Sequence, residues 1–129
     1  MSTHFPASPI AWFEIVVKDM ERAIKFYKTV FQVQLTIENM PDMQMALFPY
    51  QESYPGGALV KGDAFSQCRE GSGTTVIYLT VESVGAALSR IEKTGGSIVM
   101  PSTSIGENGF IGMFVDSEGN TIGLWAEVA

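Results

Sequence analysis

The sequence predicts an α+β fold built from two βαβββ repeats, and three observations support this class. A strand followed by a capped helix occurs twice, the second copy 64 positions after the first. Short segments with strand character follow each helix. The chain then closes on a hairpin, in which residues 110–115 and 121–125 are mostly apolar and 116–120 has turn composition. Gly119 and Asn120 tolerate a left-handed backbone, which gives this turn a physical cause.

The first repeat begins with residues 12–17, which are aromatic and β-branched and carry a single charge, Glu14. This composition predicts a strand. Asp19 is a good N-cap for a helix over 20–31, where apolar residues recur at helical spacing. Further strands are expected at 33–37, 43–48 and 57–60.

The second repeat has the same order of elements. A strand is expected at 75–81, and Ser83 caps a helix that ends at Gly95 and Gly96. A strand at 97–100 and the closing hairpin follow. Residues 57–60 correspond to 122–125 with one extra residue of offset, which indicates an internal duplication. Two unrelated α+β halves within one domain are the alternative.

The length of 129 residues, with 46% apolar and 17% charged residues, is typical of one globular domain. We expect this domain to span 9–127. Repeat one covers about 9–61, a polar linker covers 62–73, and repeat two covers about 74–127. Residues 1–8 are small, polar and punctuated by proline, which predicts a flexible N-terminal arm.

Charge and hydropathy exclude several classes of partner. The net charge of -6 argues against a nucleic-acid partner. No apolar run approaches the roughly 20 residues that span a bilayer, so we expect no membrane partner. Residues 1–8 lack the pattern of a signal peptide, and Cys68 is the single cysteine, so no intramolecular disulfide can form. We therefore expect a cytoplasmic protein.

Two segments resemble the motifs of a known superfamily. Residues 17–27, VKDMERAIKFY, resemble the V-x-D-x-x-x-A-x-x-F-Y opening of the vicinal oxygen chelate (VOC) superfamily. Residues 115–122, VDSEGNTI, are similar to its closing D-x-x-G-N-x-I hairpin. The superfamily includes glyoxalase I, bleomycin-resistance proteins and extradiol dioxygenases. The resemblance implies that each βαβββ unit forms half of a cupped, barrel-like mixed sheet, and that the protein is a homodimer. The motifs are more specific for fold than for activity.

The resemblance also implies where a divalent metal would bind. The family's ligand positions fall here on Trp12, Ala58 (or Leu59 if the alignment shifts by one residue), Val76 and Gly123. None of these side chains carries a donor atom, whereas a catalytic divalent site needs about three nitrogen or oxygen ligands. The single histidine, His4, lies in the N-terminal arm, and capping or turn roles explain Asp116 and Glu118. We therefore expect no metal and no cofactor.

Strand alternation then predicts which side chains face the cup. The inward set is Trp12, Glu14, Val76, Tyr78, Thr80, Thr121 and Trp125, with Ala58 and Gly123 leaving space. These residues describe an aromatic-walled pocket with one carboxylate and a few hydroxyl groups, which is typical of a small-molecule site.

Glu14 is the most informative of these residues, because a carboxylate within an apolar strand is costly unless it is paired or hydrated. One interpretation is functional, as a ligand contact or as a proton-transfer group. The alternatives are a structural partner of Arg90, Lys93 or a backbone amide of the other subunit, and a solvated carboxylate at the mouth of the cup.

The expected function is that of a metal-independent small-molecule-binding protein of the glyoxalase/bleomycin-resistance type. The alternative is a divergent enzyme related to lactoylglutathione lyase, a lyase or isomerase with Glu14 as general base and Tyr78 or Thr80 as proton donor. The sequence leaves open whether the two halves close within one chain or across a dimer.

Overall fold

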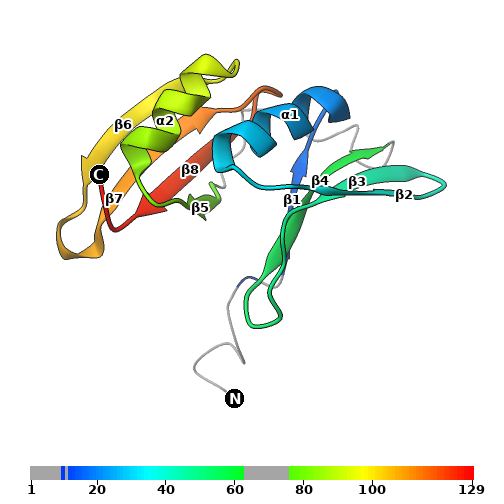
Figure 1. The fold of residues 1–129 in the computed structure, drawn as a ribbon, viewed down its shortest axis with the longest axis horizontal. Coiled ribbons are helices and arrows are strands. Elements are labelled where there is room, and N and C mark those ends of the chain that lie inside the picture. The colour runs from blue at the N-terminus through cyan, green and yellow to red at the C-terminus, as the bar shows by residue number, and fades with distance from the viewer. Residues whose placement is uncertain (1–9, 11, 63–75) are drawn as a thin grey trace.

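The computed structural model describes residue 10 and residues 12–62 and 76–129. Its elements, labelled in Figure 1, are β1 (Trp12–Val16), α1 (Met20–Phe31), β2 (Thr36–Asn39), β3 (Met43–Leu47), β4 (Gly56–Gly62), β5 (Tyr78–Thr80), α2 (Val84–Lys93), β6 (Ser97–Ser104), a 3-10 turn (Gly106–Asn108), β7 (Phe110–Val115) and β8 (Thr121–Ala126). The predicted N-terminal arm with His4, and nearly all of the predicted linker with Cys68, lie outside the described residues.

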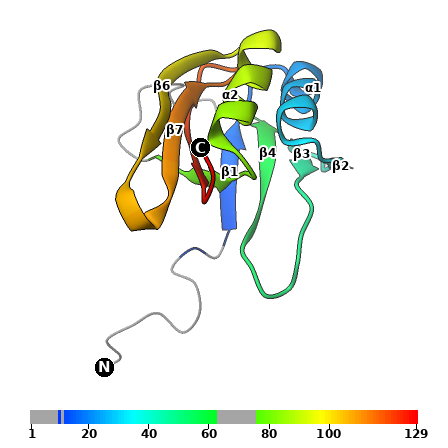
Figure 2. The same ribbon diagram turned by 60° about the vertical axis from the view of Figure 1, so that its left-hand side comes forward.

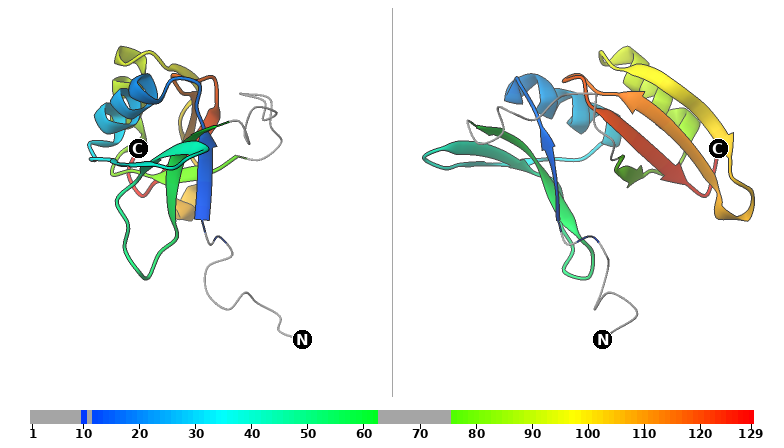
Figure 3. Two further views of the ribbon diagram at one scale, coloured as in Figure 1. Left: turned by 90° about the vertical axis from the view of Figure 1, so that its right-hand side faces the viewer. Right: turned by 180° about the vertical axis from the view of Figure 1, so that it is seen from behind.

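The strands form two four-stranded sheets, in the orders β1-β4-β3-β2 and β5-β8-β7-β6. In each sheet the first strand is parallel to the last and the other pairs are antiparallel. The predicted α+β class with two βαβββ units is therefore confirmed. The two sheets splay apart in the right-hand view of Figure 3 and do not close into a barrel within this chain.

The internal repeat is seen in the registers of the two parallel strand pairs. Ile15 on β1 lies opposite Leu59 on β4, and Leu79 on β5 lies opposite Leu124 on β8. The first and last strands of the second half are thus separated by one residue more than in the first half, as the sequence predicts. The two halves are equivalent in topology and also in the register of their parallel pair.

Some strand boundaries differ from the prediction. Gln32 ends α1 in a left-handed conformation, with φ of 56°, so the chain turns before β2 begins at Thr36. In the second half β6 continues past Pro101, because it is an edge strand with two register shifts against β7. β5 starts only at Tyr78, so the predicted site residue Val76 precedes the strand.

Both helices form at the predicted caps. The Asp19 side chain accepts a hydrogen bond from the Arg22 amide (3.0 Å), and the Ser83 hydroxyl accepts one from the Ala86 amide (3.2 Å). Figures 1 and 2 show α1 and α2 next to each other on one side of the molecule. Their apolar stripes belong to one hydrophobic cluster that draws on both halves, including Phe26, Tyr27, Leu59, Ile91, Phe114 and Leu124. The helix-covered faces of the two sheets therefore share a single core.

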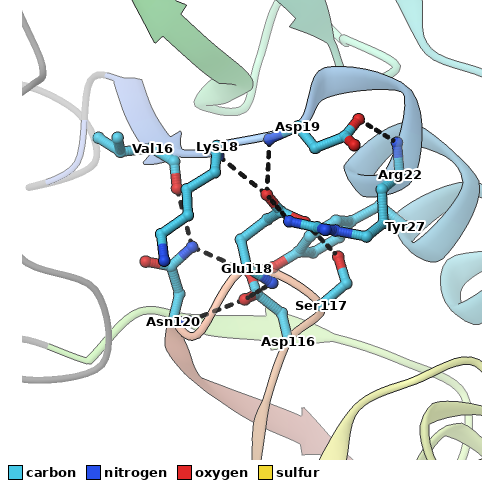
Figure 4. Close-up of polar contacts among 9 residues, drawn as sticks. All are labelled: Val16, Lys18, Asp19, Arg22, Tyr27, Asp116, Ser117, Glu118 and Asn120. Carbon is cyan, nitrogen blue, oxygen red and sulfur yellow. Dashed lines mark hydrogen bonds and ion pairs between the residues drawn. The ribbon is translucent and has the colours of Figure 1, made fainter.

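The turn of the closing hairpin ties the second half to the start of α1 (Figure 4). The Glu118 side chain is buried, with 3% exposure for the residue, although it is ionisable. Its carboxylate accepts hydrogen bonds from the backbone amides of Lys18 (2.9 Å) and Asp19 (2.8 Å), and it forms an ion pair with the Arg22 guanidinium (2.7 Å). A carboxylate from one half thus satisfies amide groups at the N-terminus of the other half's helix.

A second buried carboxylate in the same turn, Asp116, completes the connection. It accepts a hydrogen bond from the Tyr27 hydroxyl (2.7 Å) and from the backbone amides of Glu118 and Asn120 (2.9 and 2.8 Å). The Asn120 side chain donates to the Val16 carbonyl at 2.9 Å. Both buried charges are therefore supplied with donors, as burial of a charge requires.

These contacts set the protonation of the turn. Burial by itself would raise the pKa of Glu118, but hydrogen bonds from Arg22, Asp19, Lys18 and Ser117 outweigh it and lower the pKa to about 2. Burial, and then the charge of Asp116, raise the pKa of the Tyr27 hydroxyl well above its usual value. Glu118 is thus held charged and Tyr27 neutral across the ordinary pH range.

The variant Glu118→Gln tests this connection. It removes the charge but keeps the shape, and we expect a loss of about 2 to 3 kcal/mol in the free energy of unfolding at pH 7. Because the folded state lowers the pKa of Glu118, its stabilising contribution is complete above the unfolded value near 4.5 and is lost as pH falls towards 2. The difference between wild type and variant should therefore shrink over that window, as measured by urea unfolding.

The matched control is Glu92→Gln, which changes the same group at an exposed position of α2. Its effect should stay within about 0.5 kcal/mol at every pH. A Glu118→Gln variant as stable as this control at pH 7 would contradict the role given to the turn.

Candidate functional site

The helix-free face of the first sheet carries three of the predicted site residues. Ile15 points into the shared core, so by strand alternation Trp12 and Glu14 point away from the helices. Glu14 lies opposite Ala58 on β4, and the Trp12 indole donates a hydrogen bond to the Glu14 carboxylate at 3.3 Å. Trp12 is 43% exposed. The predicted alternation of β1 thus places an indole and a carboxylate side by side on an open face.

The helix-free face of the second sheet carries most of the others. Tyr78 lies opposite Gly123 and Thr80 lies opposite Trp125. A β-carbon at Gly123 would lie 2.5 Å from the Tyr78 ring, so this ring rests directly on bare backbone. Tyr78 is 46% exposed, and the Trp125 indole donates to the Asn108 carbonyl at 2.7 Å. Thr121 is the first residue of β8 and lies on the same face.

The predicted residues therefore fall on two faces and do not line a single pocket in this chain. Because the helix-covered faces meet in one core, the helix-free faces point away from it, as the right-hand view of Figure 3 shows. Among the described strands, β1 pairs with β4 and β5 pairs with β8, and neither first strand has a second partner.

Glu14 is exposed to solvent, and its recorded hydrogen-bond partner is Trp12. The suggested partner Arg90 instead donates from its side chain to the Val30 carbonyl at 2.7 Å. In the single chain Glu14 is thus a hydrated carboxylate next to an indole. It lacks the enclosure that the enzymatic alternative would need for a general base.

Tyr50, which lies between the strands expected at 43–48 and 57–60, is a further residue of the helix-free face of the first sheet that the sequence did not single out. A β-carbon at Gly56 would lie 2.6 Å from the Tyr50 ring and 3.1 Å from the Trp12 ring, so both rings cover the same glycine. Tyr50 is 61% exposed. Its position depends on how the loop between β3 and β4 folds back, and the only local signal was an aromatic residue shortly before a glycine pair.

A cleft of about 750 Å³ lies between the two halves, on the opposite side of β1 from Glu14. Its lining includes Phe13, Phe31, Phe48, Leu79, Val81 and Arg90. Of the predicted site residues, Thr80 lines it. The cleft is within the usual size of a ligand site, but its residues come from both halves, so sequence periodicity could not assemble it.

The side chains at the family's metal positions do not fit a divalent ion. Trp12, Ala58 (or Leu59), Val76 and Gly123 offer no carboxylate, imidazole or thiolate. In residues 10, 12–62 and 76–129, no three His, Cys, Asp or Glu side chains lie close enough to hold a metal ion. In that same part of the chain, none of the helices is long and apolar enough to cross a bilayer.

Residues 9–124 match the model of the Glyoxalase/Bleomycin resistance protein/Dioxygenase superfamily, and the chain belongs to this superfamily. No curated protein matches it significantly.

Several solved structures share this fold. A mutant of glyoxalase I from Zea mays superposes with a TM-score of 0.71 at 21% identity, over 92% of this chain and 47% of the maize chain, so this chain spans about half of the maize enzyme. TnmS3, an antibiotic binding protein from a Streptomyces species, gives 0.70 at 24% identity over 95% and 98% of the two chains. Glyoxalase I from Leishmania major gives 0.68 at 21% identity over 94% and 88%. At these identities the likeness shows the fold alone.

The packing around the cleft can be tested at Gly57. A β-carbon there would collide with the Phe13 ring, which also packs against Phe48 with ring centroids 5.7 Å apart. We expect Gly57→Ala to lower the free energy of unfolding by about 1 to 3 kcal/mol. The control Gly85→Ala lies in α2, where a β-carbon would meet only backbone atoms of Ala129 at 3.9 Å.

Gly85→Ala should raise the free energy of unfolding by about 0.5 to 1 kcal/mol, because alanine has the higher helix propensity. Thermal and urea unfolding followed by circular dichroism measure both variants. Equal stability of the two would show that Phe13 is free to move away and that the cleft wall is not tightly packed.

Proposed function

We propose that this protein binds a small, partly apolar molecule on the helix-free faces of its sheets, without a metal ion. The observation that carries the proposal is the exposure of large aromatic side chains there, with Trp12 and Tyr78 each more than two-fifths exposed. Exposed aromatic area next to polar groups is the usual make-up of a small-molecule site. A bound molecule would remove this area from water.

The floor beneath these rings supports the same proposal. Gly56 and Ala58 lie next to Trp12 and Glu14, and Gly123 lies beneath Tyr78. Because Gly56 and Gly123 have no side chain, the rings of Trp12 and Tyr78 pack directly against the backbone and keep part of their surface exposed. The first face combines aromatic rings with a carboxylate, and the second combines them with the hydroxyl groups of Tyr78, Thr80 and Thr121.

The superfamily includes both binding proteins and enzymes, and the geometry favours binding. TnmS3, with the same fold, is an antibiotic binding protein, whereas other neighbours are glyoxalase I enzymes. The lyase or isomerase alternative uses Glu14 as general base, but Glu14 is exposed and lacks an enclosed setting in the single chain. The family's metal positions also carry no donor side chains.

We further propose that the protein acts as a homodimer. β1 and β5 are edge strands of the described sheets, and edge strands offer unpaired backbone groups to another chain. The exposed aromatic faces would lie beside this contact and stay open to the ligand. We also propose a cytoplasmic location, in keeping with a single cysteine and no possible intramolecular disulfide.

A binding assay with a neutral fluorescent probe such as Nile red separates the sheet faces from the cleft. Trp12→Ala and Tyr78→Ala should weaken probe binding about fivefold each, because each removes aromatic contact area. Ala86→Trp, which would fill the cleft, and Tyr54→Ala, an exposed tyrosine of the loop after β3, should bind as wild type. Loss of binding in Ala86→Trp alone would assign the ligand to the cleft and overturn the proposal.

Light scattering coupled to size exclusion tests the oligomeric state. The expected mass at micromolar concentration is twice the chain mass of 14.0 kDa, because edge pairing between two copies satisfies β1 and β5 in a closed symmetric contact. A mass of one chain at every concentration up to the millimolar range would contradict the dimer. The ligand would then have to bind to the single chain.

A further inference from the structure

Three side chains that can bind a cation lie close together where β1 and β4 begin. The rings of Trp12 and Tyr50 approach the same point above Gly56, to 3.1 and 2.6 Å from a hypothetical β-carbon. Glu14 lies on the same face of β1, with its carboxylate 3.3 Å from the Trp12 indole nitrogen. Two aromatic rings therefore pack over Gly56, and one carboxylate lies beside them on the same face.

The outer surfaces of both rings are accessible to a ligand. Trp12 is 43% exposed and Tyr50 is 61% exposed. The electrostatic potential above the face of an aromatic ring is negative, so the face attracts a cation placed above it. The attraction is stronger where water is displaced. Tryptophan is the most effective of the aromatic side chains in this role.

The charge of Glu14 points in the same direction. A carboxylate has about four acceptor sites, and within the described residues the Trp12 indole occupies one of them. Within the described residues, no Lys or Arg forms an ion pair with Glu14. The net charge of -6 adds a long-range attraction for cations over the whole molecule.

We propose that Trp12, Tyr50 and Glu14 form a subsite for an organic cation, such as a substituted ammonium group on the ligand. This inference rests on the proposed function and names the chemical class of its ligand. A metal cation is a poor fit, because one carboxylate and two rings do not supply the three or more nitrogen or oxygen ligands that metals take. A purely apolar ligand would gain nothing from Glu14, which would lose hydration without a partner.

The chain offers a convenient spectroscopic test, because it contains two tryptophans. The Trp12 indole N–H lies in the subsite, whereas the Trp125 indole N–H donates to the Asn108 carbonyl and reports on the helix-free face of the second sheet. In ¹⁵N-labelled full-length protein the two indole signals can be followed separately. The probes are choline and its uncharged carbon analogue 3,3-dimethylbutan-1-ol, each added at constant ionic strength.

Choline should shift the Trp12 signal saturably and leave the Trp125 signal in place, with an apparent affinity at least fivefold higher than that of the alcohol. Glu14→Gln and Tyr50→Ala should each weaken choline binding about three- to tenfold. Tyr54→Ala is the matched control for Tyr50→Ala, because it removes an exposed tyrosine from the same loop, and it should change nothing.

Three outcomes overturn the inference in distinguishable ways. Equal shifts with choline and the alcohol, unaffected by Glu14→Gln, would leave an apolar binding face and remove the cation preference. Choline shifts of equal size at Trp12 and Trp125 would show that the cation binds both helix-free faces alike, and would remove its assignment to this subsite. If neither probe moves the Trp12 signal, and Trp12→Ala also leaves Nile red binding unchanged, the proposed function fails together with the subsite.

Discussion

Two carboxylates are buried at the junction of the two halves, and the rest of this structure depends on their hydrogen bonds. Asp116 and Glu118 come from the last turn of the chain, yet their partners are Tyr27, Lys18, Asp19 and Arg22 near its start. Such charges are stable in the interior only when their donors are in place, so the turn fixes the second half against the N-terminus of α1. The two helices then share one core.

This packing decides which faces of the sheets are exposed. Once both helices lie in the shared core, the opposite face of each sheet points outward and carries aromatic side chains that a single chain does not cover. Trp12 and Glu14 lie on one such face, and Tyr78 and Trp125 on the other. Without a ligand or a partner, the single chain exposes an unusually aromatic surface to water. For this reason we interpret these faces as binding surfaces.

The sequence predicted those features that depend on local patterns. The helix caps Asp19 and Ser83, the alternation that puts Trp12 beside Glu14, and the extra residue in the second parallel pair all follow from residue order alone. The partners of Glu118, the loop position of Tyr50 and the cleft lined by Phe13 and Arg90 do not, because they arise from packing between segments distant in the chain or from loop conformation. For the same reason, the residues predicted to line one pocket lie on two separate faces of the single chain.

The most direct test of this account is hydroxyl-radical footprinting by mass spectrometry, on the protein as purified and after any bound small molecule has been extracted. Trp12 and Tyr78 should become clearly more oxidised after extraction, or less oxidised when a ligand is added back, while Tyr54 stays constant. Protection confined to Phe31 and Phe48 would place the ligand in the cleft instead and contradict the assignment of the helix-free faces as the binding site.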